Sequence, residues 1–128
     1  MTKIRILHAD DKAEENFYLK KSLGEVEFEI DYVTNSDELV EKAKENQGLY
    51  ALILTDCDMS DKYGSYGGLH ASREIRKFDI KTPIVLLSSM HVSDEALRES
   101  GINGKIEKHI VDEKLKFLEE VNKYLVRS

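Results

Sequence analysis

Two short segments, residues 51–55 and 84–87, are almost entirely apolar, and they constrain the fold more than any other feature of the chain. A strand with one exposed face alternates polar and apolar residues, so continuous apolar runs of this length indicate strands covered on both faces. Such strands are typical of parallel sheets, whose crossover connections are usually helices. The two segments therefore predict an α/β domain with a buried parallel sheet.

The rest of the chain alternates strand and helix patterns around these two segments. Strands are expected at residues 4–8, 26–33 and 105–109, and helices at 13–23, 69–78, 93–100 and 112–125. A further helix is expected after Asn35 or Ser36, carrying Leu39, Val40 and Ala43. The expected caps or stops of these helices are Gly24, Asn35 or Ser36, Ser93, Gly101 and Asp112. Within residues 26–33, Val26, Phe28, Ile30 and Tyr32 share one side, as in a strand near a sheet edge. The last helix carries an apolar stripe of Leu115, Leu118, Val121 and Leu125. Five strands alternating with five helices predict a parallel sheet with right-handed crossovers.

Length, charge and composition limit the class of protein. The chain has 128 residues, the size of one domain, and no segment resembles a linker or an apolar membrane span. Its net charge of −6 argues against nucleic acid as a partner. Cys57 is the only cysteine, so no intramolecular disulfide is possible, and the N-terminus lacks the apolar stretch of a signal peptide. We therefore expect a cytoplasmic protein without membrane contact.

Polar residues follow several of the expected strands. Asp10 and Asp11 follow the first strand, and Asp56 follows the third. The carboxyl ends of parallel strands share one crevice, where three carboxylates would repel one another unless a cation joined them. Mg2+ is a hard ion that takes oxygen ligands, commonly a few carboxylates together with a phosphate. The acids therefore indicate phosphoryl chemistry.

A hydroxyl and a cation complete the pattern, with Ser88 and Ser89 after the fourth strand and Lys108 at the fifth. Each residue alone has an ordinary explanation as a helix cap, a turn residue or a surface charge. An acid pair, a single acid, a hydroxyl and a lysine at four strand ends form a more specific combination. With this combination, the chain resembles the receiver domain of two-component response regulators over essentially its whole length. The resemblance implies a flavodoxin-like (βα)5 three-layer sandwich with strand order 2-1-3-4-5. It also implies a single-domain protein, with residues 1–128 as the receiver and no output domain.

The resemblance assigns the phosphoacceptor and the metal ligands. Asp56 matches the phosphoacceptor, within the sequence Leu-Ile-Leu-Thr-Asp-Cys-Asp-Met. Asp11 is expected to bind Mg2+ (or Mn2+) directly and Asp10 mainly through water, with Asp56 and the backbone carbonyl of Asp58 as further ligands.

Further residues are expected to bind the phosphoryl group or to tune its lifetime. Ser88 matches the switch hydroxyl, Ser89 the small residue after it, and Lys108 the family's lysine. Asp58 and Met90 are expected to influence the lifetime of the acyl phosphate.

The resemblance also implies how such a protein acts. A sensor histidine kinase or phosphotransfer protein would donate a phosphoryl group from a phosphohistidine to Asp56. The signal would pass to a downstream protein target through a changed surface, or onward by phosphorelay. The protein would then be a signalling domain rather than an enzyme.

The chain departs from the family pattern at several positions. His109 replaces the proline that usually follows the lysine, Lys105 replaces the aromatic switch residue, and Ser60 replaces a proline after the phosphoacceptor. The loop 60–68 is about four residues longer than the corresponding loop of the family that the chain resembles. It is either a flexible surface insertion or a flap that contacts a partner.

Two other functions stay open at this point. The acids Asp56 and Asp58 also resemble the first motif of haloacid-dehalogenase-like phosphohydrolases, although that family places its further metal-binding acids late in the chain, whereas the acid pair here is near the N-terminus. The alternative within the same fold is a receiver-like interaction module that is not phosphorylated. Among other polar residues, the four histidines lack the spacing of a zinc site and are expected at the surface or in loops. Cys57 is expected to pack in the core.

Overall fold

The sheet expected from the sequence is present in the computed structural model, which describes residues 2–125. The strands are β1 (Ile4–Ala9), β2 (Phe28–Val33), β3 (Leu52–Asp56), β4 (Ile84–Ser88) and β5 (Gly104–Glu107). The helices are α1 (Ala13–Leu23), α2 (Ser36–Glu45), α3 (Gly67–Ile75), α4 (Asp94–Glu99) and α5 (Lys114–Tyr124), with the 3-10 helix η1 (Lys108–Asp112) between β5 and α5. All neighbouring strands pair in parallel, in the order β2-β1-β3-β4-β5. This confirms the predicted topology.

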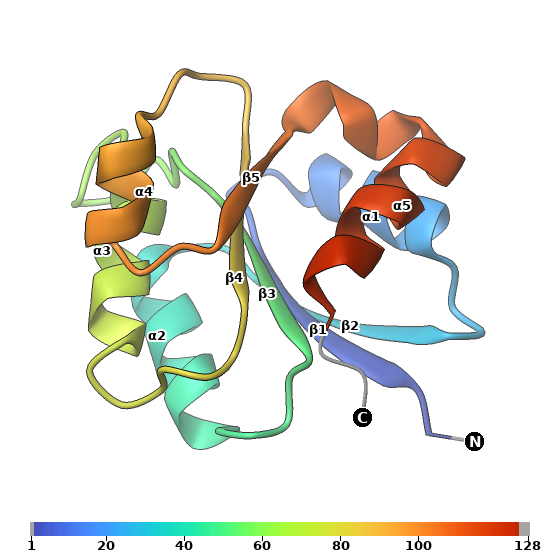
Figure 1. Cartoon of the computed structure of the whole chain (residues 1–128), viewed down its shortest axis with the longest axis horizontal. Coiled ribbons are helices and arrows are strands. Elements are labelled where there is room, and N and C mark those ends of the chain that lie inside the picture. Colours follow the sequence, from blue (N-terminus) through green and yellow to red (C-terminus); the bar gives the residue numbers. More distant parts are fainter. Residues whose placement is uncertain (1, 126–128) are drawn as a thin grey trace.

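Helices cover both faces of the sheet. Figure 1 shows α1 and α5 on one side of the strands and α2, α3 and α4 on the other. Contacts between α1 and α5, between α2 and α3, and between α3 and α4 complete the two outer layers. The domain is therefore the three-layer flavodoxin-like sandwich that the resemblance implies.

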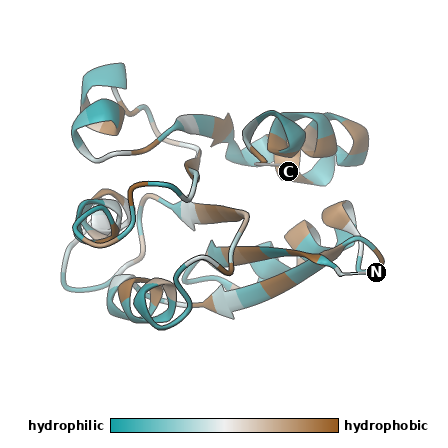
Figure 2. Cartoon of the chain, turned by 60° about the horizontal axis from the view of Figure 1, so that its bottom comes forward, coloured by the Kyte–Doolittle hydropathy of each residue, from teal (hydrophilic) through white to brown (hydrophobic). Residues whose placement is uncertain are grey.

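The core is divided by the sheet into two apolar clusters. Alternate residues of one strand point to opposite faces, so Leu7 and Ile53 belong to the cluster under α2 and α3, whereas Ile6 and Leu52 belong to the cluster under α1 and α5. Every residue of β3 and β4 is buried, as their continuous apolar sequences predict. In Figure 2, apolar colour is concentrated along the strands, while much of the helical surface is hydrophilic.

Three of the predicted helix boundaries are fixed by local chemistry. α1 ends at Gly24, whose φ of 84° lies in the region that glycine adopts without strain. The Asn35 side chain caps α2 by accepting a hydrogen bond from the Glu38 amide at 2.9 Å. The Ser93 hydroxyl caps α4 by accepting from the Ala96 amide at 3.1 Å.

The second strand and the third helix have boundaries that differ from the sequence prediction. The second strand begins at Phe28 rather than at residue 26, and Val26 lies in the preceding turn with 94% of its surface exposed. The alternation of polar and apolar residues that predicted the strand also extends over the turn before it. The third helix covers Gly67–Ile75 rather than residues 69–78, since it begins with two glycines that helix propensity disfavours.

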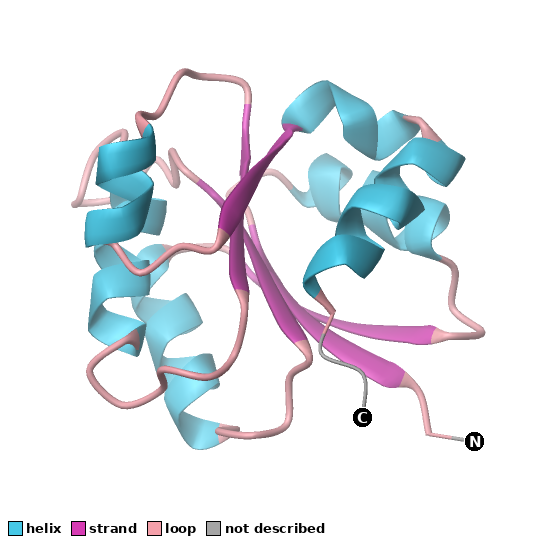
Figure 3. Cartoon of the chain, in the orientation of Figure 1, coloured by secondary structure: helices cyan, strands magenta, loops and turns pink. Residues whose placement is uncertain are grey.

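The last strand and helix differ from the sequence prediction. β5 ends at Glu107, and Lys108 and His109 lie in η1 instead of continuing the strand; Figure 3 shows the strand running directly into this helical turn. Asp112 also belongs to η1 and does not cap α5. The core face of α5 is centred on Phe117, which is fully buried, whereas the predicted core residue Leu115 is 82% exposed. The intervening 3-10 turn shifts the start of α5, and this changes which residues face the sheet.

Among residues 2–125, no helix has the length and apolar content needed to cross a bilayer.

Candidate functional site

Three acidic side chains meet at the carboxyl ends of β1 and β3. Asp56 is the last residue of β3, and Asp10 and Asp11 directly follow β1. The two strands are hydrogen-bonded neighbours with Ala9 opposite Thr55, so the parallel register brings Asp10 beside Asp56. Asp10, Asp11 and Asp56 each offer a ligand oxygen, and these oxygens all lie within 4.8 Å of one another. The predicted acid cluster is therefore present.

Lys108 enters the same cluster from the start of η1. Its ammonium Nζ lies 3.0 Å from Oδ2 of Asp10 and 3.1 Å from Oδ2 of Asp56. Only 16% of the Lys108 side chain is exposed, so this cation pairs with both acids largely away from water. Lys108 is therefore the counter-ion of both acids in this structure.

Burial and crowding of like charges change the acidity of the cluster. Burial, and then the charge of Asp10, raise the pKa of Asp56 to about 6, against the opposing effect of Lys108. Burial likewise raises the pKa of Asp10. Burial alone would lower the pKa of Lys108, but its hydrogen bonds and charge interactions with the two acids raise it above the ordinary value. The site therefore holds more negative charge than Lys108 neutralises.

The donor set fits a hard divalent cation. The three carboxylates cluster tightly, two of them are buried and Asp11 is half-buried. Mg2+ prefers such oxygen ligands, and a second cation would offset the mutual repulsion of Asp10 and Asp56, which adds to burial in raising the pKa of Asp56.

Backbone contacts fix the orientation of the acids. The Lys12 amide donates to Oδ1 of Asp10 at 2.9 Å, and the Tyr32 hydroxyl donates to the Asp10 carbonyl at 2.7 Å. The Cys57 amide donates to Oδ1 of Asp56 at 2.8 Å. Sequence reasoning did not assign a role to Tyr32, because only the sheet register brings β2 to this loop.

Gly68 allows α3 to lie against the backbone of the phosphoacceptor candidate. Its amide donates to the Cys57 carbonyl at 2.9 Å, and a Cβ at this position would lie 2.1 Å from the Asp56 carbonyl oxygen. Only glycine permits this approach.

The side chains enclose a cavity of about 290 Å³. Its lining includes all the predicted residues except the fully buried Asp10, together with Lys12 and Ser60: Asp11, Lys12, Asp56, Asp58, Ser60, Ser88, Ser89, Met90 and Lys108. Lys12 and Ser60 were not predicted to line the site. Their closeness in sequence to Asp11 and Asp58 could have indicated it. The cavity is large enough for a phosphoryl group and several waters.

The hydroxyl of Ser88 is occupied by the loop that follows β4. It donates to the Met90 carbonyl at 3.1 Å and accepts from the Met90 amide at 3.0 Å. Ser88 is buried, while Ser89 is exposed at the cavity. Lys105, on β5, donates to the same Met90 carbonyl at 3.0 Å.

Asp58 lies at the cavity with an exposed side chain. Its Oδ1 accepts a hydrogen bond from the Ser60 amide at 2.9 Å, which forms a tight turn. Ser60 has a φ of 51°, an unusual value for a residue other than glycine.

The longer loop 60–68 is anchored to α2. Oδ2 of Asp61 accepts from the Ser36 amide at 2.8 Å, and Oδ1 accepts from the Tyr63 amide at 3.0 Å. The Tyr63 ring stacks on His70 of α3, with centroids 3.8 Å apart. These contacts support a loop of defined conformation.

His8 corrects another expectation. The sequence placed the histidines at the surface or in loops, but His8 is 1% exposed in β1. Burial, and then the charge of Lys108, lower the pKa of His8 to about 3, so it is neutral. Its Nδ1 contacts the Asn16 amide nitrogen at 3.4 Å. Cys57 is fully buried, as expected.

Comparisons with known proteins agree with this geometry. The model of the response regulator receiver domain family matches residues 6–118, so the chain belongs to this family. Receiver domains of this family are signalling domains of two-component systems, and they bind Mg2+ at an acidic pocket. The comparison with curated protein sequences gave no match.

Solved structures of receiver domains have the same fold. The chemotaxis protein CheY4 of Vibrio cholerae is 18% identical with a TM-score of 0.78, covering 97% of this chain and 100% of that one. The response regulator domain of CheB from Thermotoga maritima is 23% identical with a TM-score of 0.76, covering 99% and 100%. The response regulator TrrA of Thermotoga maritima, solved in complex with Mg2+ and BeF, is 28% identical with a TM-score of 0.76, covering 95% and 99%.

Proposed function

We propose that this receiver domain accepts a phosphoryl group on Asp56 from a phosphohistidine of a sensor histidine kinase or phosphotransfer protein. The single observation that carries the proposal is the position of Asp56. Asp56 opens into a cavity that Asp11 also lines, with the Lys108 ammonium 3.1 Å away and Ser88 at the same end of the neighbouring strand β4. Phosphoryl transfer depends mainly on positioning and on charge neutralisation, and this arrangement provides both.

In the transfer step, a carboxylate oxygen of Asp56 attacks phosphorus while the bond from phosphorus to the imidazole nitrogen breaks. The nitrogen keeps the electron pair of that bond, and the product on Asp56 is an acyl phosphate. The nucleophile must be ionised, and a pKa of about 6 leaves most of Asp56 ionised at neutral pH. Lys108 then shifts its hydrogen bonds from the carboxylate to a phosphoryl oxygen.

A bound Mg2+ would neutralise charge on the phosphoryl oxygens, held by Asp10, Asp11, Asp56 and the carbonyl of Asp58. The tight cluster of carboxylate oxygens supports this assignment. The Mg2+ and BeF in the TrrA structure support it further, as a metal with a phosphoryl-like ligand in a relative.

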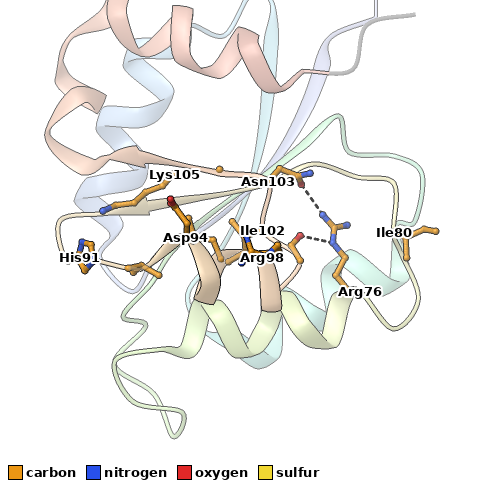
Figure 4. Close-up of a pocket in the computed structure, with 12 residues that line it drawn as sticks. Arg76, Ile80, His91, Asp94, Arg98, Ile102, Asn103 and Lys105 are labelled. Atoms are coloured by element: carbon orange, nitrogen blue, oxygen red, sulfur yellow. Dashed lines mark hydrogen bonds between the residues drawn. The ribbon is translucent and has the colours of Figure 1, made fainter.

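The output would arise from the loop after β4. Ser88 is 3.0–3.1 Å from Met90 in this structure, and a phosphoryl group on Asp56 offers its hydroxyl a charged acceptor. Movement of this loop would alter the face formed by α4 and β5. That face contains a cleft of about 800 Å³, shown in Figure 4, with His91, Asp94, Arg98 and Lys105 in its lining. A downstream protein target would bind to this face in its changed conformation, or the phosphoryl group would be transferred to another protein in a phosphorelay.

The test is Mg2+-dependent labelling by a small acyl phosphate donor. Wild-type protein should become labelled, and Asp56→Ala should lose the label while its circular dichroism spectrum stays unchanged. Asp37→Asn is the matched control, because it removes an exposed acid of α2 that does not line the cavity, and it should leave labelling unchanged. Label that persists in folded Asp56→Ala would refute the assignment.

A further inference from the structure

We propose that Lys105 is a positioning residue for the switch at Ser88. By holding the Met90 carbonyl, its ammonium leaves the Ser88 hydroxyl free to turn toward a phosphoryl group on Asp56. The inference rests on the proposed function and adds to it a residue at which the chain departs from its family, since an aromatic side chain is expected at this position.

The Ser88 hydroxyl cannot serve two acceptors at once. It has one proton, and in this structure that proton is directed to the Met90 carbonyl at 3.1 Å. A hydrogen bond from Ser88 to a phosphoryl oxygen therefore requires that the Met90 carbonyl lose this donor. The Met90 amide donates a hydrogen bond to the Ser88 oxygen at 3.0 Å and therefore does not compete for the hydroxyl proton.

Losing the Ser88 donor would be costly if the Met90 carbonyl had no other partner. Met90 is half-buried, and an acceptor left unpaired in a partly dry environment opposes the change. Lys105 removes this obstacle, because its Nζ already donates to the same carbonyl at 3.0 Å. Two donors that share one acceptor also bind it less strongly than either would alone, which further weakens the hold of Met90 on Ser88.

The position of Lys105 makes this contact well defined. It lies on β5 opposite Leu86 of β4, and only 18% of its side chain is exposed. Oε1 of Glu107, on the same strand, lies 3.3 Å from the ammonium and orients it. In Figure 4 the Lys105 side chain extends from β5 toward the end of the cleft where His91 lies.

A role of Lys105 in holding the loop in its unphosphorylated conformation would give the opposite result. Removing the ammonium would then make it easier for the Ser88 hydroxyl to bind a phosphoryl group on Asp56. If Lys105 instead frees the Ser88 hydroxyl, removing the ammonium weakens the hydrogen bond from Ser88 to the phosphoryl group. This effect requires a protein that has the Ser88 hydroxyl.

The experiment measures the affinity of the full chain for beryllofluoride in saturating Mg2+, by isothermal titration calorimetry. Lys105→Met should weaken binding about threefold to tenfold, the range of one ordinary hydrogen bond. Lys105→Arg, which keeps a charged donor, should restore most of the affinity. In a Ser88→Ala background, Lys105→Met should have no further effect, because the proton that Lys105 frees is absent.

Unchanged or tighter binding by Lys105→Met would overturn the proposal, and so would an equal loss in the Ser88→Ala background. Lys123→Met is the matched control, since it removes a lysine paired with Glu120 at 3.0 Å on the exposed face of α5. In the unligated protein, the carbonyl 13C shift of Met90 should move in Lys105→Met and return in Lys105→Arg. A wild-type protein that neither binds beryllofluoride nor becomes labelled would refute the proposed function, whereas a labelled wild type with an unaffected Lys105→Met refutes this inference alone.

Discussion

The ammonium of Lys108 donates a hydrogen bond to Oδ2 of Asp56 at 3.1 Å, and this ion pair joins the end of β3 to the start of η1. β4 lies between β3 and β5 in the sheet, so the Lys108 side chain spans the width of β4, at the carboxyl edge of the sheet, to contact Asp56. The same ammonium lies 3.0 Å from Asp10, after β1. One cation therefore compensates two buried acids from different strands.

We expect Lys108→Met to destabilise the protein in a pH-dependent way. At pH 8 with EDTA, two buried acids lose their cation, and the free energy of unfolding should fall by about 3–5 kcal/mol. At pH 5 the loss should be much smaller, because Asp56, with a pKa of about 6, is then mostly protonated even in the wild type. Urea unfolding at the two pH values measures the difference. Lys123→Met should change stability by less than about 0.5 kcal/mol, and an equal loss for Lys108→Met at both pH values would contradict the explanation.

Ionisation of Asp56 should itself destabilise the fold. Its pKa is raised to about 6 in the folded protein from 3.8, so the folded state binds this proton more tightly than the unfolded chain. The resulting stability is present below pH 4 and is lost as the pH rises through 6. Asp56→Asn has no such proton to lose. In EDTA at pH 8 it should be more stable than the wild type by about 1–3 kcal/mol, with the difference vanishing near pH 4. A wild-type advantage at pH 8 would show that the contact with Lys108 outweighs the burial of charge.

The sequence predicted which side chains gather at one edge of the sheet, because parallel strands direct their carboxyl ends to one edge. Asp10, Asp11, Asp56 and Ser88 lie at the ends of β1, β3 and β4, and Lys108 joins them from the start of η1, just after β5. The parallel sheet followed from the continuous apolar runs of β3 and β4, which are buried throughout, whereas the strand order came from the family resemblance.

The errors arose where tertiary contacts override local pattern. His8 was expected at the surface or in a loop, because the histidines lack the spacing of a zinc site, but its place in β1 buries it beside Asn16 of α1. The 3-10 turn after β5 has no sequence periodicity of its own, so Lys108 was assigned to a strand and Leu115 to the core. The role of Tyr32 depends on the register between β1 and β2, which no local pattern encodes.

Mg2+ should stabilise the wild-type protein through its acids. Mg2+ at millimolar concentration should raise the melting temperature, because it binds the folded cluster and not the unfolded chain. Asp11→Asn should weaken the apparent affinity at least about tenfold. Asp58→Asn should retain nearly the wild-type response, because only the backbone carbonyl of Asp58 is assigned to the metal. Thermal unfolding over a Mg2+ series gives both affinities. If Asp58→Asn loses the response as fully as Asp11→Asn, the Asp58 carboxylate is a ligand and the assignment is wrong.

The anchored conformation of loop 60–68 should depend on Asp61. Its two carboxylate oxygens accept hydrogen bonds from the Ser36 and Tyr63 amides at 2.8 and 3.0 Å, and such bonds lower the pKa of Asp61 although burial opposes them. Asp61→Ala leaves both amides unpaired and should cost about 1–2 kcal/mol at pH 7. Because the folded-state pKa is lowered, the wild-type advantage is present above pH 4 and is lost as the pH falls below it.

The same variant decides between the two interpretations of the loop. Limited proteolysis should cleave Asp61→Ala within residues 60–68 well before wild-type protein, whose loop is held against α2 and stacked on His70. Lys77→Met is the control, since it removes an ion pair with Glu74 that lies outside this loop and in which the lysine is mostly exposed, and it should change neither stability nor cleavage within residues 60–68. Wild-type protein that is cleaved in this loop as fast as Asp61→Ala would show that the insertion is flexible despite its contacts. Protection of the wild-type loop that increases on adding the partner kinase would instead identify it as part of the kinase contact surface.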